Sequence, residues 1–169
     1  MLRFLTLVTC AAMTLWLGGL IALFTFVQAM FNTDRATAAN AAPILFRVFE
    51  IYQLGLFVVA IVAQIGWRLI SCSRSKKWIT ALLMLAGLLA VIETAFVSSR
   101  MRAMMSGEQP GGEEFRRLHS YSMMIYSTET LLLAAAACLL PAAISADALR
   151  RARLAAVRWQ ETSPHTQPA

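Results

Sequence analysis

The sequence contains little charge for its length. Of its 169 residues, 14% are Asp, Glu, Lys or Arg and 59% are hydrophobic, whereas soluble domains carry about 25% charged residues. This composition excludes an ordinary soluble domain and indicates an integral membrane protein. The net charge of +6 arises from basic residues scattered at the ends of apolar segments. That pattern is typical of Lys/Arg anchors beside a membrane, so we expect no nucleic-acid binding.

Cysteine is also scarce, and only Cys10, Cys72 and Cys138 occur. They form no CxxC pair and leave an odd number, which predicts free thiols rather than a disulfide framework. Catalytic signatures are lacking as well. The sequence has no phosphate-binding glycine loop, no G-x-S-x-G and no H-E-x-x-H, and we therefore do not expect an enzyme.

Four long apolar segments dominate the chain, at about 4–31, 44–70, 79–99 and 118–144. Each is long enough to cross a bilayer, for which ~20 apolar residues suffice. They predict an all-α integral membrane protein, a four-transmembrane-helix bundle formed by residues 1–145. Such a multi-pass protein is expected in the inner or plasma membrane. A short polar loop from Asn32 to Pro43 joins the first two spans, with Pro43 in the first turn of the second helix.

The distribution of basic residues favours one orientation. They are more numerous on the side that holds the N-terminus, the 71–78 loop and the tail 146–169, so the positive-inside rule predicts that both termini are cytoplasmic. The tail is expected to form a short helix followed by a disordered end. Basic residues of the loop and tail are expected to meet anionic lipid headgroups; they are Arg74, Lys76, Lys77, Arg150, Arg151, Arg153 and Arg158.

Ionisable residues interrupt the apolar segments at similar depths. In the predicted orientation Glu50, Glu93 and Glu129 lie roughly 9–15 Å below the outer surface, at ~1.5 Å per residue. Ionisable residues inside a membrane pair with one another or line a water-filled path, because an unpaired charge is costly there. The spacing predicts one outward-facing polar cavity, with the following candidate residues: Arg47, Glu50, Glu93, Arg100, His119, Tyr126 and Glu129.

Helical spacing predicts which side chains share a face. Arg47 and Glu50 are three residues apart and can pair on the second helix, where Glu50, Phe57 and Gln64 form one face. The face predicted for the third helix consists of Ala86, Ala90, Glu93 and Val97. The face predicted for the fourth helix consists of His119, Met123, Tyr126, Thr130, Ala134, Ala137 and Pro141.

Methionines and a histidine gather around the third loop. Thioether and imidazole groups suit copper(I), although methionine is also a common space-filling residue of membrane helices, and we expect no bound cofactor. His119 alone could ligate haem. The other histidine, His165, lies in the tail on the opposite side, which excludes bis-histidine ligation within one chain. The candidate metal ligands are His119, Met101, Met104, Met105 and Met123, with Met124 beside them.

Short motifs resemble those of the DUF4149 (transmembrane-protein-205-like) family. They are Trp16-Leu-Gly-Gly19, Leu45-Phe-Arg-Val-Phe49, Arg100-Met-Arg102 and Phe115-Arg-Arg-Leu-His-Ser120, with Ser122 as the serine of an F-x-x-L-H-x-x-S stretch. The resemblance covers about residues 5–145 and implies a four-span integral membrane protein, without assigning an activity. The layout is also similar to that of the CopD-like copper-resistance membrane domains, an association at the level of fold alone.

Two functions of different classes stay open on the sequence alone. The first is a small transport or permeation component that moves protons or metal cations through the predicted cavity. The second is a structural or accessory membrane protein, alone or as a homo-oligomer, whose buried ionisable residues only fix helix packing. A haem-binding membrane protein is a third and more distant hypothesis.

Overall fold

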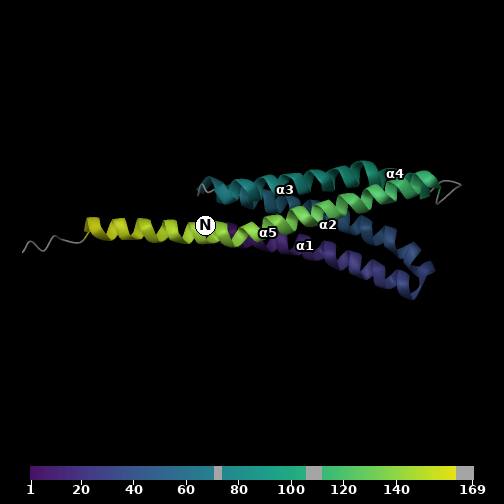
Figure 1. Ribbon diagram of the computed structural model, residues 1–169, viewed down its shortest axis with the longest axis horizontal. Coiled ribbons are helices and arrows are strands. Elements are labelled where there is room, and N and C mark those ends of the chain that lie inside the picture. Colours follow the sequence, from purple (N-terminus) through teal and green to yellow (C-terminus); the bar gives the residue numbers. More distant parts are fainter. Residues whose placement is uncertain (71–73, 106–111, 163–169) are drawn as a thin grey trace, which may run out of the picture.

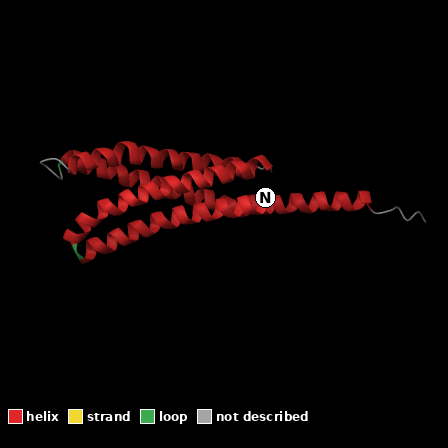
Figure 2. Ribbon diagram, turned by 180° about the vertical axis from the view of Figure 1, so that it is seen from behind, coloured by secondary structure: helices red, strands yellow, loops and turns green. Residues whose placement is uncertain are grey.

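The computed structural model describes residues 1–70, 74–105 and 112–162, and nearly all of them are helical. The elements are α1 (Leu2–Thr33), α2 (Arg35–Ile70), α3 (Arg74–Ile92), the π-helix η1 (Glu93–Ser98), α4 (Ser99–Met105) and α5 (Glu113–Thr162). α3, η1 and α4 follow one another without a break (Figure 1). The described part of the chain contains no strand (Figure 2).

Within the described residues, four helical stretches are long and apolar enough to cross a membrane. Their bounds are Leu2–Thr33, Arg35–Ile70, Ser75–Met104 and Glu113–Trp159. Large apolar side chains such as Phe4, Val58 and Leu131 are exposed on the outside of the bundle, as a lipid environment permits. The all-helical architecture with four membrane-length helices, predicted from the sequence, is confirmed.

The four long helices pack as two pairs. α1 lies along α2 and α3 along α5, while contacts between α2 and α3 and between α1 and α5 join the pairs. One end of the bundle holds the N-terminus and the start of α3, and we call it the N-terminal end (Figure 1). The other holds the α1–α2 turn and α4, and we call it the distal end.

The first connection is shorter than predicted. Only Asp34 separates α1 from α2, whereas the sequence predicted a loop from Asn32 to Pro43. Asp34 Oδ1 caps α2 by accepting the backbone N–H groups of Ala36 and Thr37 at 2.9 and 3.3 Å. These hydrogen bonds, with that from the Thr37 hydroxyl the strongest, lower the pKa of Asp34. Pro43 lies inside α2 because the alanine-rich stretch before it favours helix.

α5 is longer than the predicted fourth span. It continues through Pro141 to Thr162 and extends beyond the N-terminal end of the bundle (Figure 1). The tail predicted to begin at residue 146 is therefore helical as far as it is described, and its side chains from Ala148 to Trp159 are exposed. The expected disordered end includes residues 163–169, which lie outside the described residues.

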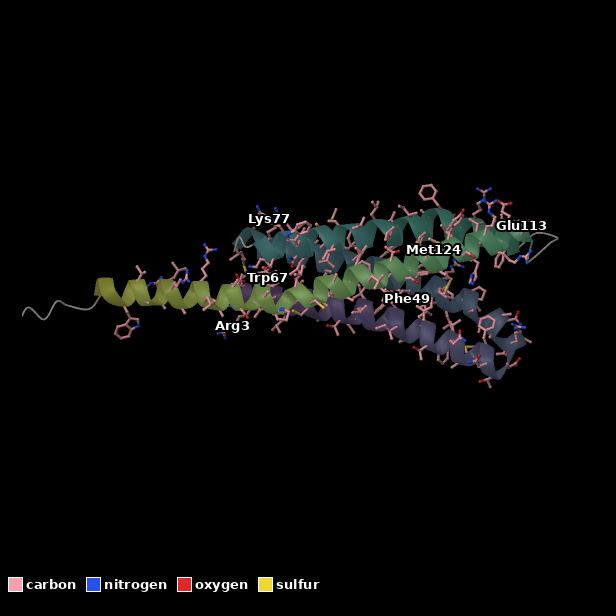
Figure 3. All side chains as sticks on the ribbon, in the orientation of Figure 1. Arg3, Phe49, Trp67, Lys77, Glu113 and Met124 are labelled. Carbon is pink, nitrogen blue, oxygen red and sulfur yellow. The ribbon has the colours of Figure 1, made fainter. Side chains whose placement is uncertain are left out.

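One lysine of the predicted basic loop is buried. Lys76 belongs to the first turn of α3, is 0% exposed, and places Nζ 2.7 Å from Oδ2 of Asp147 on α5. The prediction that Lys76 meets lipid headgroups is therefore wrong, because a buried carboxylate from another helix compensates its charge. The neighbouring Lys77 is exposed and points away from the bundle (Figure 3).

The cysteines agree with the predicted free thiols as far as they are described. Cys10 is half-buried in α1, Cys138 is exposed on α5, and both are free. Cys72 lies outside the described residues.

The close approach of α2 and α3 depends on Gly87. A Cβ atom at this position would lie 2.1 Å from Cε2 of Phe57 on α2. The Phe57 ring also packs against Trp16 of α1, with ring centroids 5.9 Å apart. Three helices therefore meet around one phenyl ring in the middle of the bundle, and buried Leu83 and Leu133 belong to the same apolar core.

Replacing Gly87 by alanine should destabilise the bundle. The added methyl group must displace the Phe57 ring, and overpacking of this kind typically costs about 1–3 kcal/mol. Thermal unfolding in detergent would measure the change. Gly55→Ala is the control, since a Cβ at Gly55 meets nothing within 4 Å and should leave the melting temperature unchanged or higher. Equal melting temperatures for both variants would contradict the predicted clash.

Candidate functional site

Glu93 lies at the start of the π-helix, inside the bundle. Its side chain is 0% exposed, and its Oε1 accepts hydrogen bonds from the hydroxyls of Ser122 on α5, at 2.6 Å, and Ser98, at 3.4 Å. Ser98 is five residues after Glu93, and the wider π-turn brings residues with this spacing to the same side of the helix. Single π-turns occur often at functional sites, so the local backbone singles out Glu93.

Glu129 is a second buried carboxylate, near the middle of the bundle. It is 0% exposed, and its Oε1 accepts the indole N–H of Trp16 on α1 at 2.7 Å. At ~1.5 Å per residue, Glu129 lies roughly 24 Å along α5 from Glu113 and roughly 27 Å from Asp147. Neither Glu93 nor Glu129 forms an ion pair with any described residue.

Glu50 forms an ion pair near the distal end. Its Oε2 lies 2.9 Å from Nη1 of Arg102 on α4, and the exposed fractions of the two side chains are 3% and 40%. The sequence instead offered Arg47 as the partner, and that expectation is wrong. Arg47 is exposed because it lies on the edge of α2, outside the face that turns Glu50 inward. Arg102 connects the buried carboxylates with the exposed surface.

Tyr126 lies among these groups. Its side chain is 1% exposed and is within electrostatic range of Arg102 and all three carboxylates. Phe24 of α1 and Phe46 of α2 flank its ring, at centroid distances of 5.7 and 5.8 Å. Three aromatic rings, from α1, α2 and α5, therefore pack together at this place.

Several buried polar atoms around the carboxylates have no protein partner among the described residues. Buried polar atoms in folded proteins are almost always hydrogen-bonded to protein or water. A cluster of unpaired atoms therefore marks a place where water, protons or a bound species can be held. The atoms are Glu50 Oε1, Gln53 Oε1 and Nε2, Glu93 Oε2, Thr94 Oγ1, Tyr126 Oη and Glu129 Oε2.

The inward face of α5 is rotated by about one residue from the predicted one. The structure buries Ser122, Tyr126, Glu129, Leu133 and Ala136, whereas the predicted stripe began with His119 and Met123, which are both exposed. Tyr126 is common to both sets. A small serine at the inward position lets Glu93 approach α5 closely, which a histidine or methionine there would prevent.

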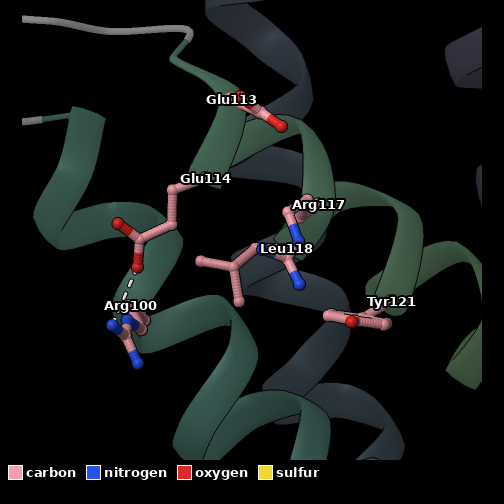
Figure 4. Close-up of a pocket in the computed structure, with 6 residues that line it drawn as sticks. All are labelled: Arg100, Glu113, Glu114, Arg117, Leu118 and Tyr121. Carbon is pink, nitrogen blue, oxygen red and sulfur yellow. Dashed lines mark hydrogen bonds and ion pairs between the residues drawn. The ribbon is translucent and has the colours of Figure 1, made fainter.

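Two further predicted cavity residues lie at the distal surface. Arg100 is exposed and pairs with Glu114 at 2.8 Å, and His119 is exposed with its ring stacked on Phe115 at a centroid distance of 6.4 Å. A surface hollow of about 480 Å³ lies beside Arg100, but none of the three buried carboxylates lines it. Its lining residues are Arg100, Glu113, Glu114, Arg117, Leu118 and Tyr121 (Figure 4).

The candidate metal ligands are less buried than the carboxylates. Met123 and Met124 are exposed, Met101 and Met104 are half-buried, and the side chain of Met105 lies outside the described part of the structure. The described residues contain no group of three or more His, Cys, Asp and Glu side chains able to hold a metal ion. His165 lies outside the described residues.

Several residues of the site were not predicted. Trp16, Gln53, Ser98, Arg102 and Ser122 contact the carboxylates or lie buried near them. A sequence signal existed for some of them: Gln53 is three residues from Glu50, and Ser122 is one turn before Tyr126. For Trp16 and Arg102 the partner is on another helix, so local spacing carries no signal.

Comparison with known proteins gives one match. The profile described as "Domain of unknown function (DUF4149)" matches residues 11–110. This range holds Trp16, Glu50, Glu93 and Arg102, while Glu129 on α5 follows it. No curated protein and no solved structure matches the chain.

Removing the indole N–H from Trp16 should destabilise the protein through Glu129. Trp16→Phe keeps an aromatic ring but leaves the buried carboxylate without its donor, which typically costs about 1–3 kcal/mol. Thermal unfolding in detergent would measure this, with Trp78→Phe at an exposed position as control. In a Glu129→Leu background, where no carboxylate needs the indole donor, Trp16→Phe should lower the melting temperature by a smaller amount. An equal cost in both backgrounds would mean that only ring packing is lost.

Proposed function

The chain belongs to the DUF4149 family, and we propose that it is a multi-pass membrane protein that transfers protons through Glu50, Glu93 and Glu129. The proposal keeps the transport class expected from the sequence and narrows its cargo from protons or metal cations to protons. Four helices long and apolar enough to span a membrane support the location, and the buried carboxylates support the activity.

The observation that carries the proposal is the shortage of cations around the buried acids. The three glutamates are at most 2% exposed as whole residues, yet Arg102 is the one described cation paired with them, through Glu50. An ionised carboxylate in an apolar bundle without a counter-ion costs several kcal/mol. Glu93 and Glu129 therefore need a proton or a bound cation, and groups neutralised in this way can take up and release protons.

The order of the groups supports a route rather than a single binding point. Arg102 and Glu50 lie nearest the distal surface, Glu93 is bound to Ser122, and Glu129 follows about 10 Å further along α5 at ~1.5 Å per residue. Tyr126 lies between Ser122 and Glu129 on the same helix face. Carboxyl and hydroxyl groups in such a series can relay protons, as acidic chains do in membrane pumps.

Spacing also favours protons over metal cations. A hard cation such as Ca²⁺ requires six or more oxygen ligands that converge at 2.3–2.6 Å. The three carboxylates instead follow one another along the bundle, and the described residues hold no cluster of three potential acidic, histidine or cysteine ligands. Copper and haem are not part of the proposal, because His119, the ligand common to both hypotheses, is exposed and stacked on Phe115.

The proposed orientation follows from the basic residues. With both termini in the cytoplasm, the exposed Lys77 and the arginines of the α5 extension are on the cytoplasmic side of the inner or plasma membrane. There they can bind anionic lipid headgroups. Arg102 and Glu50 then lie toward the outer side, so that protons enter the route from outside.

A structural or accessory function has its own support. The same contacts join α2 to α4, η1 to α5 and α1 to α5, through Glu50, Glu93 and Glu129 respectively. Buried polar pairs of this kind can fix the register of neighbouring helices without any transport. Flux measurements distinguish this alternative from proton transfer.

Reconstitution into liposomes that contain a pH-sensitive dye tests the proposal. With a membrane potential imposed by potassium and valinomycin, the protein should acidify the lumen faster than protein-free liposomes do. Glu93→Gln keeps the size of the side chain and an oxygen for Ser122, but it cannot exchange a proton. We expect it to lower the flux at least about tenfold, equivalent to ~1.4 kcal/mol in the barrier.

The matched control is Glu114→Gln, at the exposed partner of Arg100, which should leave the flux unchanged. Thermal unfolding of each variant checks that the fold is intact. A wild-type flux equal to that of empty liposomes would overturn proton transfer and leave the accessory function. An unchanged flux in folded Glu93→Gln would remove Glu93 from the route.

A further inference from the structure

A second group of buried charged side chains lies at the N-terminal end of the bundle. Lys76 Nζ on α3 lies 2.8 and 2.7 Å from the two carboxylate oxygens of Asp147 on α5, and the side chains are 0% and 4% exposed. Trp67 of α2 donates its indole N–H to Asp147 Oδ2 at 2.7 Å and places its ring centroid 4.5 Å from Nζ. Three helices contribute to this buried group.

Further polar groups surround the pair. Gln64 Nε2 on α2 donates to the backbone oxygen of Lys76 at 3.2 Å and to Thr80 Oγ1 at 3.4 Å, while its Oε1 is buried without a protein partner among the described residues. Among the described side chains, the other charged groups here are Arg151 of α5, whose Nε donates to the Asp147 backbone oxygen at 3.2 Å, and the exposed Arg68 beside Trp67 on α2.

We propose that the Lys76–Asp147 pair is a second proton-exchange site, which hands protons between the carboxylates and the N-terminal end of the bundle. The inference rests on the proton transfer proposed above. It assigns the far end of the route to residues that neither the sequence nor the family match singles out as functional.

The order of buried side chains is the same on three helices. α2 carries Glu50 and Gln53, then Ala60 and Ala63, then Gln64 and Trp67. α3 with η1 carries Glu93 at one end and Thr80 and Lys76 at the other, with buried Leu83, Ala86 and Ala90 between. α5 carries Ser122 and Glu129, then Leu133, Ala136 and Ala143, then Asp147. The two polar layers thus face each other across one apolar layer.

The thickness of the apolar layer differs between helices. At ~1.5 Å per residue it separates Gln53 from Gln64 on α2 by roughly 16 Å and Glu129 from Asp147 on α5 by roughly 27 Å. Most of its buried positions are alanines, and the ring of Phe57 packs there against Gly87 and Trp16. Movement of one aromatic ring would leave a gap lined by small side chains, through which water can connect the two layers.

The proton balance at the pair is simple. A proton that arrives from the carboxylate side binds Asp147 and neutralises it. Lys76, whose partner Asp147 is then neutral, loses one proton from Nζ at the N-terminal end of the bundle. The proton on Asp147 then moves across the 2.7 Å hydrogen bond to the neutral amine. The ion pair is restored, and one proton has crossed.

Lys76→Arg separates proton exchange from a purely structural ion pair. Arginine keeps the positive charge and can pair with Asp147, but it cannot give up its proton in a protein. In the dye-loaded liposomes we expect the flux of this variant to fall at least about tenfold, with little change in melting temperature. Lys77→Arg, at the exposed neighbouring lysine, is the matched control and should keep the wild-type flux.

A second variant covers the case in which arginine does not fit. Lys76→Met combined with Asp147→Asn removes both charges of the pair and keeps an acceptor for the Trp67 N–H, a change that buried pairs often tolerate. If Lys76→Arg does not fold, this double variant decides by the same measurement. We expect it to fold and to lose the flux.

The outcomes distinguish the two proposals. The second exchange site would be overturned if Glu93→Gln abolishes the flux while folded Lys76→Arg, or the double variant, keeps the wild-type flux. The proposed function would then stay intact. Absence of flux in the wild type would overturn both. Failure of both Lys76 variants to fold, with Lys77→Arg normal, would make the pair a structural contact and also overturn the inference.

Discussion

An ionised side chain that leaves water without a partner loses most of its solvation energy, and this constraint decides how the four helices meet. Each of the three buried glutamates accepts a hydrogen bond from a side chain on another helix. Arg102 donates to Glu50, Ser122 to Glu93, and Trp16 to Glu129. Since apolar contacts between helices and with lipid tails are similar in strength, these few directed contacts specify which faces turn inward.

The same constraint explains why the buried polar groups form two layers rather than one. A single continuous column of charged and hydroxyl groups would bring water through the whole bundle. The layer around Phe57 and Gly87 interrupts it with close apolar packing. The proposed proton transfer requires such a seal together with groups that can change their charge, and the core of the bundle contains both an apolar layer and buried carboxylates.

The sequence predicted the parts of the fold that local patterns encode. Four apolar runs give four long helices, and the predicted face of Ala86, Ala90, Glu93 and Val97 is buried as expected. Patterns within one helix also predicted that Glu50 and Gln64 share an inward face. On α5 the predicted face, which begins at His119, is rotated by about one residue from the buried one, because the smaller Ser122 is the residue that faces Glu93. The short turn at Asp34 was missed because polar residues suggested a loop where alanines favour helix.

Pairings between distant residues could not be predicted in this way. Lys76 and Asp147 are 71 positions apart, and each looks like a surface residue in its own segment. The packing of α3 against α5 brings the two side chains together as a buried ion pair. Arg102 is similar, since Arg47 is nearer to Glu50 in sequence but lies outside the buried face. The contacts that local sequence patterns predict least well are thus the ion pairs between buried charged side chains of different helices.

Because of the π-helix, the number of residues in the third span decides which side chains after Ser98 face the other helices. A single π-turn accommodates one residue more than an α-turn, so every residue after Ser98 is rotated by about 100° relative to an uninterrupted α-helix. That extra residue turns Arg102 toward Glu50, whereas Arg100 faces the exposed Glu114. Among relatives of this protein, the loss of one residue within Glu93–Ser98 would restore an ordinary α-turn and keep Arg102 directed at Glu50, whereas the loss of one residue between Ser98 and Arg102 would present a different side chain to Glu50. Insertions and deletions in these few residues therefore carry as much information about the carboxylate cluster as substitutions within it.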